Sequence, residues 1–132
     1  MKAARWYTGL AGVFLLLQGT STLAFRLIPA LDAAFPQLLG TTHMMPLHST
    51  LHIVTGLLAL WPLQRGGARG PWWFALGFGA FYTGLALVGF VTHRPTIFQL
   101  QTFDHPFHLG LGLVGLGIAA GTYRSCFGGT AR

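Results

Sequence analysis

The sequence predicts an all-α protein whose four long helices form a transmembrane bundle, and two observations lead to this prediction. First, only 8% of the 132 residues are charged and 52% are hydrophobic, whereas a soluble domain normally carries about 25% charged residues. Second, the apolar residues gather in four segments, each close to the ~20 residues that cross a hydrocarbon core of ~30 Å. The length fits a single domain covering residues 1–132.

The predicted spans have recognisable starting signals. Pro46 and Pro71 stand in a first helical turn, where the missing amide donor has no helical partner to lose. Asp104 is a favourable N-cap because its carboxylate accepts hydrogen bonds from free amides. The four spans run from about Tyr7 to Ile28, from Pro46 to Leu63, from Pro71 to Val91 and from Asp104 to Tyr123.

The first segment also has the layout of a secretory signal, since Lys2 and Arg5 precede its apolar run. However, its apolar stretch is long for a signal, and the following "TLA" is a poor cleavage sequence. We therefore expect a retained transmembrane helix at this position.

Basic residues predict which way the bundle faces. Because cytoplasmic loops of membrane proteins are enriched in Lys and Arg, we expect both termini in the cytoplasm. The first outer connection, from Pro29 to Met45, has apolar residues spaced for a short helix, which we expect in the outer membrane interface. Six basic residues fall on the cytoplasmic side of this arrangement: Lys2, Arg5, Arg65, Arg69, Arg124 and Arg132.

The formal net charge of +6 does not indicate nucleic-acid binding. The basic residues are scattered at the ends of apolar runs, without a basic stripe or an aromatic stacking platform. The expected partner is the lipid bilayer, with a membrane-protein partner or a second copy of the chain as open alternatives. The single Cys126 forms no internal disulfide.

The second and fourth segments share the pattern [LF]-H-x-x-x-G-L-x-x-L. The histidine and the glycine carry this signal, because leucine matches are common among apolar helices. Aligning the two segments gives three pairs of equivalent positions: His48 with Asp104, His52 with His108, and Gly56 with Gly112.

The first and third segments align less well, with Gly12 on Gly77 and Gly19 on Gly84. Such a repeat predicts two helical hairpins related by an axis along the membrane normal. The histidine-bearing ends of the second and fourth helices then lie at similar depth and point toward the bundle centre.

The ionisable groups share helix faces with small residues. Close helix packing in lipid selects Gly and Ala, so we expect these faces to point inward. Residues at a spacing of three or four lie on one face of a helix. The first face consists of His48, His52, Gly56 and Ala59, and the second of Asp104, His108, Gly112, Gly115 and Ala119.

Three interpretations of these faces remain open. In the structural one, the histidines and Asp104 satisfy free amides at the helix starts and one another, close to the membrane surface where an ionisable group is less costly. In the second, His48, His52, Asp104 and His108 bind a divalent metal such as zinc or iron. The sequence contains no glutamate, which excludes an H-E-x-x-H hydrolase site.

The third interpretation is a cofactor site. His52 and His108 are then axial ligands of a b-type haem or a chlorin held between facing helices. The glycine one turn after each histidine, Gly56 or Gly112, is expected to leave room for the flat macrocycle.

The order of these motifs resembles a family of small bacterial four-helix membrane proteins described only as a domain of unknown function. In that family the second and fourth helices open with Asn, Asp or His, followed by a Leu-His step and a Gly. Here His48 stands where Asn is more usual. The resemblance covers nearly the whole chain, through "YTGLAGVFLLLQG", "PLHSTLHIVTGLLAL", "ALGFGAFYTGLALVGF" and "DHPFHLGLGLVGL".

The sequence therefore favours a small non-enzymatic protein of the bacterial inner membrane, with multiple spans and no catalytic residue. An accessory subunit of a membrane complex, with the His/Asp cluster closing the outer end of the bundle, fits this description. A haem- or metal-binding protein in electron transfer is the alternative. A transporter is disfavoured, because only Gln18 and a few hydroxyl groups are available to line a path through the membrane.

Overall fold

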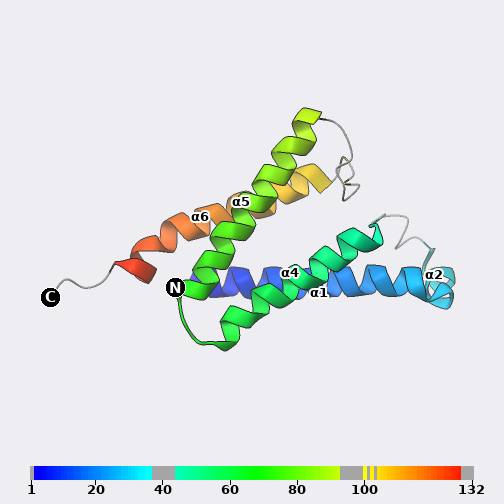
Figure 1. Cartoon of the computed structure of the whole chain (residues 1–132), viewed down its shortest axis with the longest axis horizontal. Coiled ribbons are helices and arrows are strands. Elements are labelled where there is room, and N and C mark those ends of the chain that lie inside the picture. Colours follow the sequence, from blue (N-terminus) through cyan, green and yellow to red (C-terminus); the bar gives the residue numbers. More distant parts are fainter. Residues whose placement is uncertain (1, 37–43, 93–99, 101, 103, 129–132) are drawn as a thin grey trace.

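The computed structural model is all-helical within the residues that it describes, which are 2–36, 44–92, 100, 102 and 104–128. The prediction of an all-α protein is confirmed, and each of the four long predicted segments is helical (Figure 1). The helices in these ranges are α1 (Lys2–Leu27), α2 (Pro29–Ala34), α4 (Pro46–Gln64), α5 (Arg69–Thr92) and α6 (Asp104–Phe127).

The four long helices form two antiparallel hairpins, α1 with α4 and α5 with α6, whose members cross each other (Figure 1). Glycines permit each crossing. A Cβ atom at Gly56 of α4 would lie 2.9 Å from the carbonyl oxygen of Gly12 in α1. A Cβ at Gly112 of α6 would likewise lie 2.9 Å from the carbonyl oxygen of Gly79 in α5. The backbones therefore approach closer than any residue with a Cβ allows.

These contacts correct the predicted alignment of the first and third segments. Gly12 of α1 corresponds to Gly79 of α5, not to Gly77, because Gly12 and Gly79 make the same contact with their partner helices. A Cβ atom at Gly77 or at Gly84 would meet no atom within 4 Å among the described residues. These two glycines lie on the outer face of α5, so their match with glycines of α1 was a coincidence of composition.

Fewer contacts join the two hairpins than join the helices within each one. The Tyr7 hydroxyl of α1 donates to the carbonyl oxygen of Leu111 in α6 at 2.8 Å. The Thr8 hydroxyl donates to the carbonyl oxygen of Pro71 in α5 at 3.1 Å. Tyr7 also packs edge-on against the ring of Phe78, at 6.2 Å between centroids. Among the described residues, the seam thus includes aromatic packing and these hydrogen bonds to backbone carbonyls.

One end of the molecule, which we call the basic end, collects the start of α1, the turn between α4 and α5, and the end of α6. Arg5 donates to the carbonyl oxygens of Leu63 and Gly67 in that turn, at 3.3 and 3.4 Å. Arg69 lies over the Phe127 ring at 5.3 Å. The described basic residues of this end are Lys2, Arg5, Arg65, Arg69 and Arg124.

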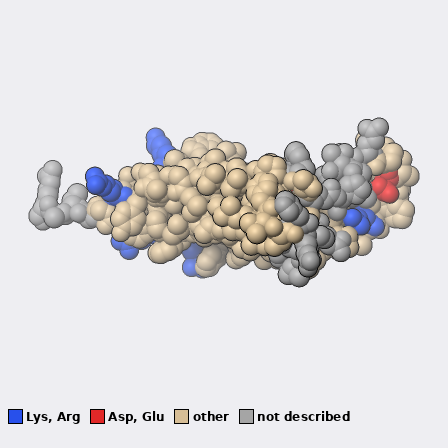
Figure 2. All heavy atoms as spheres, turned by 90° about the horizontal axis from the view of Figure 1, so that it is seen from above, with Lys and Arg blue, Asp and Glu red and all other residues tan. Residues whose placement is uncertain are grey.

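Two of the helices, α1 and α5, are long and apolar enough to cross a membrane. Within the most apolar 18-residue window of each helix, only 28% of α1 and 33% of α5 is buried. Most of these apolar side chains therefore face outward. On the face shown in Figure 2, basic side chains lie toward one end of the molecule, and basic and acidic side chains lie toward the other. The middle of this face shows no charged side chain.

The predicted short helix between Pro29 and Met45 corresponds in part to α2. This helix has six residues, and the Phe35 amide donates to the carbonyl oxygen of Leu31 at 3.0 Å. Phe35 packs edge-on against Phe25 of α1, with 6.1 Å between ring centroids. Residues 37–43 of the same connection lie outside the described residues.

Candidate functional site

The structure brings together three of the predicted ligands, and we call these the three-histidine cluster: His48, His52 and His108. His48 and His52 lie one turn apart on α4, with ring centroids separated by 4.5 Å. His108 of α6 reaches the same point from the other hairpin, 6.1 Å from the His48 ring. The ligand atoms of the three imidazoles all lie within 4.8 Å of one another. Each side chain is 2–3% exposed.

Both helices place these side chains within their first two turns, because both begin just before them. Pro46 opens α4 after Met45 in an extended conformation. Asp104 is in the first turn of α6. On α4 the predicted inward face is confirmed, since His48, His52, Gly56 and Ala59 are all buried. On α6 the predicted members His108, Gly112, Gly115 and Ala119 are buried, whereas Asp104 is partly buried.

A glycine on α1 allows the histidine-bearing face of α4 to be covered. A Cβ at Gly19 would lie 2.6 Å from the carbonyl oxygen of Ser49 and 3.0 Å from the Cβ of His52. The two helices meet at this point because the glycine is there. His52 is therefore enclosed by backbone as well as by side chains.

Hydrogen bonding of the cluster is incomplete. Neither ring nitrogen of His52 has a hydrogen-bond partner among the described residues, and the same holds for Nδ1 of His108. A buried polar atom without a partner costs about 1–3 kcal/mol. A neutral imidazole offers one donor and one acceptor, so His52 leaves both unused. The acceptor nitrogen of the enclosed His52 ring is therefore available to an ion, whereas, among the described residues, its N–H donor lacks the outer acceptor that metal-ligating histidines usually have.

Asp104, the fourth predicted ligand, lies at the edge of the three-histidine cluster. Its carboxylate is near enough to act electrostatically on His48 and on His108. It is partly buried, and it is not among the side chains whose ligand atoms converge within 4.8 Å. Its position suits a group that orients or neutralises the imidazoles from outside the cluster.

Tyr82 of α5 was not predicted as part of the site. It is 2% exposed, and its ring lies edge-on to His108 at 4.7 Å and 85°. On its other side it stacks on Phe78 at 4.1 Å. The four-residue spacing of Phe74, Phe78 and Tyr82 marks a helix face, but nothing in that spacing distinguishes a wall of the site from ordinary core packing.

The room expected for a macrocycle beside His52 and His108 is filled. A Cβ at Gly56 would lie 2.7 Å from Cγ of Leu16 in α1, and one at Gly112 would lie 2.9 Å from the Gly79 carbonyl oxygen. Both glycines therefore serve helix crossing. The expectation of an open slot beside these glycines is wrong, because neighbouring helices use the space.

The remaining histidines do not join the cluster in the described part of the chain. His105 is 7% exposed and packs against Phe90 of α5, 5.6 Å between ring centroids, beside Gly89. His43 and His93 lie outside the described residues. Burial alone therefore does not mark a cluster member, since His105 is buried and stands apart.

Comparison with known proteins places the chain in a family. A family model described as "Domain of unknown function (DUF4383)" matches residues 5–121. The chain belongs to this family. The match extends from the first turn of α1 into the last turns of α6, and it confirms the predicted relationship to a domain of unknown function. No curated protein and no solved structure matches the chain.

Proposed function

We propose that this DUF4383 member is a four-span protein of the bacterial inner membrane that binds one divalent transition-metal ion through His48, His52 and His108. The observation that carries the proposal is His52, which is enclosed at 2% exposure with neither nitrogen paired among the described residues. The role is non-enzymatic: the ion holds the two hairpins together at the end opposite the basic end.

Zinc is the ion that suits the cluster best. It accepts three imidazole nitrogens at about 2.0–2.1 Å in a tetrahedral arrangement, which places the nitrogens about 3.3 Å apart. The ligand atoms lie within 4.8 Å of one another, so small rotations of the rings close the site. The one cysteine, Cys126, is at the far end of α6, so no thiolate favours a softer ion such as Cu(I).

The geometry favours an ion over a haem. Axial ligands approach a macrocycle from opposite faces, whereas here three rings converge and His48 lies against both His52 and His108. The space at Gly56 and Gly112 is also taken by neighbouring helices.

The membrane placement is supported by two features. Apolar side chains of α1 and α5 face outward along most of their length. Five of the six described basic side chains, all except Arg26, gather at one end beside exposed tryptophans, as expected at a cytoplasmic membrane surface. Three tryptophans of this end are more than half exposed: Trp6, Trp61 and Trp73.

Zinc titration of the detergent-purified, chelator-treated protein tests the metal proposal. We expect one zinc per chain, and an affinity reduced at least 100-fold in His52→Ala, since even outer groups of metal sites contribute 10–100-fold. His105→Ala is the matched control, because it also removes a buried imidazole of the same region. Its zinc affinity is expected to stay within about threefold of the wild type.

A wild-type protein that takes up no stoichiometric zinc would contradict the metal proposal and favour a purely structural histidine cluster. Equal losses in His52→Ala and His105→Ala would contradict it as well. Helical circular dichroism and an unchanged elution volume in detergent establish that each variant is folded.

The topology is checked separately with a reporter fused after Arg132 and another inserted between Pro29 and Met45. We expect cytoplasmic activity from the first and periplasmic activity from the second.

A further inference from the structure

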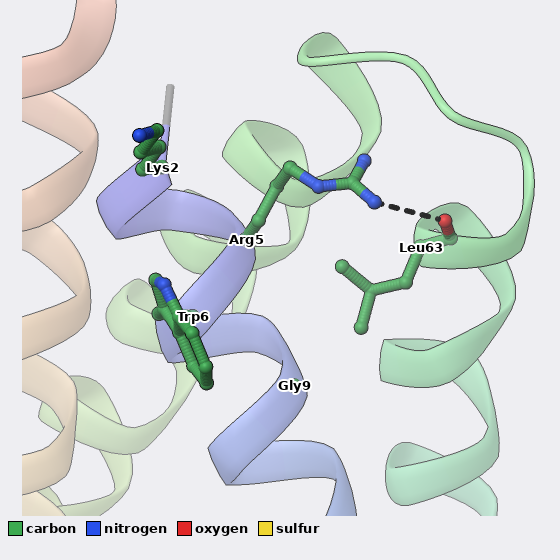
Figure 3. A pocket seen from close by; sticks show the side chains of 5 residues that line it. All are labelled: Lys2, Arg5, Trp6, Gly9 and Leu63. Carbon is green, nitrogen blue, oxygen red and sulfur yellow. Dashed lines mark hydrogen bonds between the residues drawn. The ribbon is translucent and has the colours of Figure 1, made fainter.

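An open cavity lies at the basic end, far from the three-histidine cluster. Its volume is about 600 Å³, and it is lined by side chains of α1 and by the end of α4 (Figure 3). We call it the basic-end cavity, and the residues that line it are Lys2, Arg5, Trp6, Gly9 and Leu63.

The two cations of this cavity have no acidic side chain beside them in the described part of the chain. The sequence contains two acidic residues; Asp32 is on α2, beyond the far end of α1, and Asp104 opens α6 next to the three-histidine cluster. Arg5 donates to the backbone carbonyl oxygens of Leu63 and Gly67, at 3.3 and 3.4 Å. A guanidinium has five N–H donors, so Arg5 retains donors for an anion.

Apolar surface continues from the cavity along α1. Trp6 is 69% exposed, Leu10 66%, Val13 48% and Leu17 65%. Their spacing of three or four residues places them on one side of the helix. Lys2 stands one turn before Trp6 on the same side, as Figure 3 shows. A ligand lying here meets cations at one end and an apolar strip beyond them.

We propose that the basic-end cavity binds the phosphate headgroup of an anionic phospholipid of the inner leaflet. Lys2 and Arg5 neutralise the phosphate, Trp6 lies at the level of the glycerol backbone, and an acyl chain follows the strip of Leu10, Val13 and Leu17. Basic pockets between helices on the cytoplasmic side are suited to such headgroups. This inference rests on the membrane placement proposed above and is independent of the metal.

Native mass spectrometry of the full chain in detergent tests the proposal. Phosphatidylglycerol and phosphatidylcholine of the same acyl composition are added at equal concentration. We expect phosphatidylglycerol to be retained more strongly, on the order of tenfold, because its headgroup carries a net negative charge, whereas the choline of phosphatidylcholine balances the charge of the phosphate. The double variant Lys2→Gln/Arg5→Gln is expected to lose this preference. The double variant Arg65→Gln/Arg124→Gln, also lowering the net charge from +6 by two, is expected to keep it.

Gly9→Leu provides a second variant that removes no charge. A Cβ at Gly9 would lie 3.5 Å from Cδ1 of Leu63, an ordinary contact, so the added Cβ needs no backbone shift, and the rest of the leucine side chain is placed at the cavity that Gly9 lines. We expect weaker phosphatidylglycerol binding in this variant, and unchanged zinc affinity in both cavity variants.

Equal retention of the two lipids by the wild type overturns the proposal. So does an equal loss of preference in the two charge variants, because that result assigns the effect to surface charge in general. Displacement of phosphatidylglycerol by millimolar inorganic phosphate overturns the lipid assignment, since the phosphate group alone then explains binding. Because zinc titration is a separate measurement, failure here leaves the metal proposal standing, and failure of the metal proposal leaves this one standing.

Discussion

The hairpins α1–α4 and α5–α6 have the same kind of glycine-mediated helix crossing, but the side chains packed near the crossing differ. In the first, the hydroxyls of Thr22 and Ser49 share a hydrogen bond of 2.9 Å. At the equivalent place in the second, the ring of His105 lies against Gly89. The comparison indicates that the glycine contact determines how the helices cross, while positions about two to three turns away differ, with a hydroxyl pair in one hairpin and a buried ring in the other.

The hairpins differ again at the three-histidine cluster. The helix α4 supplies two imidazoles, His48 and His52, whereas α6 supplies one, His108, and has Asp104 at the position equivalent to His48. The two similar hairpins thus contribute an asymmetric set of three imidazoles and one nearby carboxylate. Three pairs of variants, each comparing a position with its counterpart or neighbour, test these differences.

The largest expected effect separates His48 from its equivalent, Asp104. We expect His48→Ala to lower zinc affinity at least 100-fold, because it removes a ligand. Asp104→Ala should lower it only about tenfold, as expected of a group that supports ligands from outside. Zinc titration of the two purified variants measures both values. A loss for Asp104→Ala as large as that for His48→Ala would assign the carboxylate to the metal itself.

The second comparison concerns the glycines of α6. A Cβ at Gly112 would lie 2.6 Å from the backbone nitrogen of Thr83, whereas one at Gly110 meets nothing within 4 Å among the described residues. We expect Gly112→Ala to lower the free energy of unfolding by about 1–3 kcal/mol, the usual cost of overpacking. Gly110→Ala should be neutral or raise it by up to about 1 kcal/mol, because Ala favours helix.

Reversible unfolding in mixed detergent, followed by circular dichroism, measures both glycine variants. Equal effects would mean that the crossing of α5 and α6 relaxes freely around an added methyl group. We expect Gly56→Ala to lower the free energy of unfolding by about as much as Gly112→Ala, because both glycines occupy the same place in their hairpins.

The smallest expected effect compares two neighbouring hydroxyls of α4. Ser49 is fully buried and bonds across to Thr22, whereas Thr50 is exposed and donates to the Pro46 carbonyl of its own helix at 2.8 Å. We expect Ser49→Ala to cost about 0.6 kcal/mol of unfolding free energy, the average for a hydrogen bond between membrane helices. Thr50→Ala should cost less. The reverse order would show that the hydroxyl pair contributes nothing to the first hairpin.

The helices and the inward faces were predictable because small residues and histidines repeat every three or four positions on α4 and α6. The alignment of the first and third segments was not. The helix α5 carries glycines on more than one face, and composition alone does not separate Gly79, which meets α6, from Gly77 on the outer face.

The candidate site was predictable only as a set of residues. The sequence placed His48, His52 and His108 on inward faces, but their convergence depends on how the two hairpins pack together. The aromatic wall formed by Tyr82 escaped prediction for a different reason, since it reaches His108 across the contact between α5 and α6 within one hairpin. The prediction of open space beside Gly56 and Gly112 was wrong, because a glycine in a helix can mark the close approach of a neighbouring helix as well as an opening.

The division of the three-histidine cluster between α4 and α6 has a thermodynamic consequence. In the proposed zinc-bound form, one ion held by both hairpins would join two halves that otherwise share few contacts, and linkage would make this effect reciprocal. Any force or partner that separates the two hairpins would then lower the zinc affinity by the same factor by which zinc stabilises their association. The protein would then convert metal supply into mechanical cohesion, and strain within the bilayer into metal release.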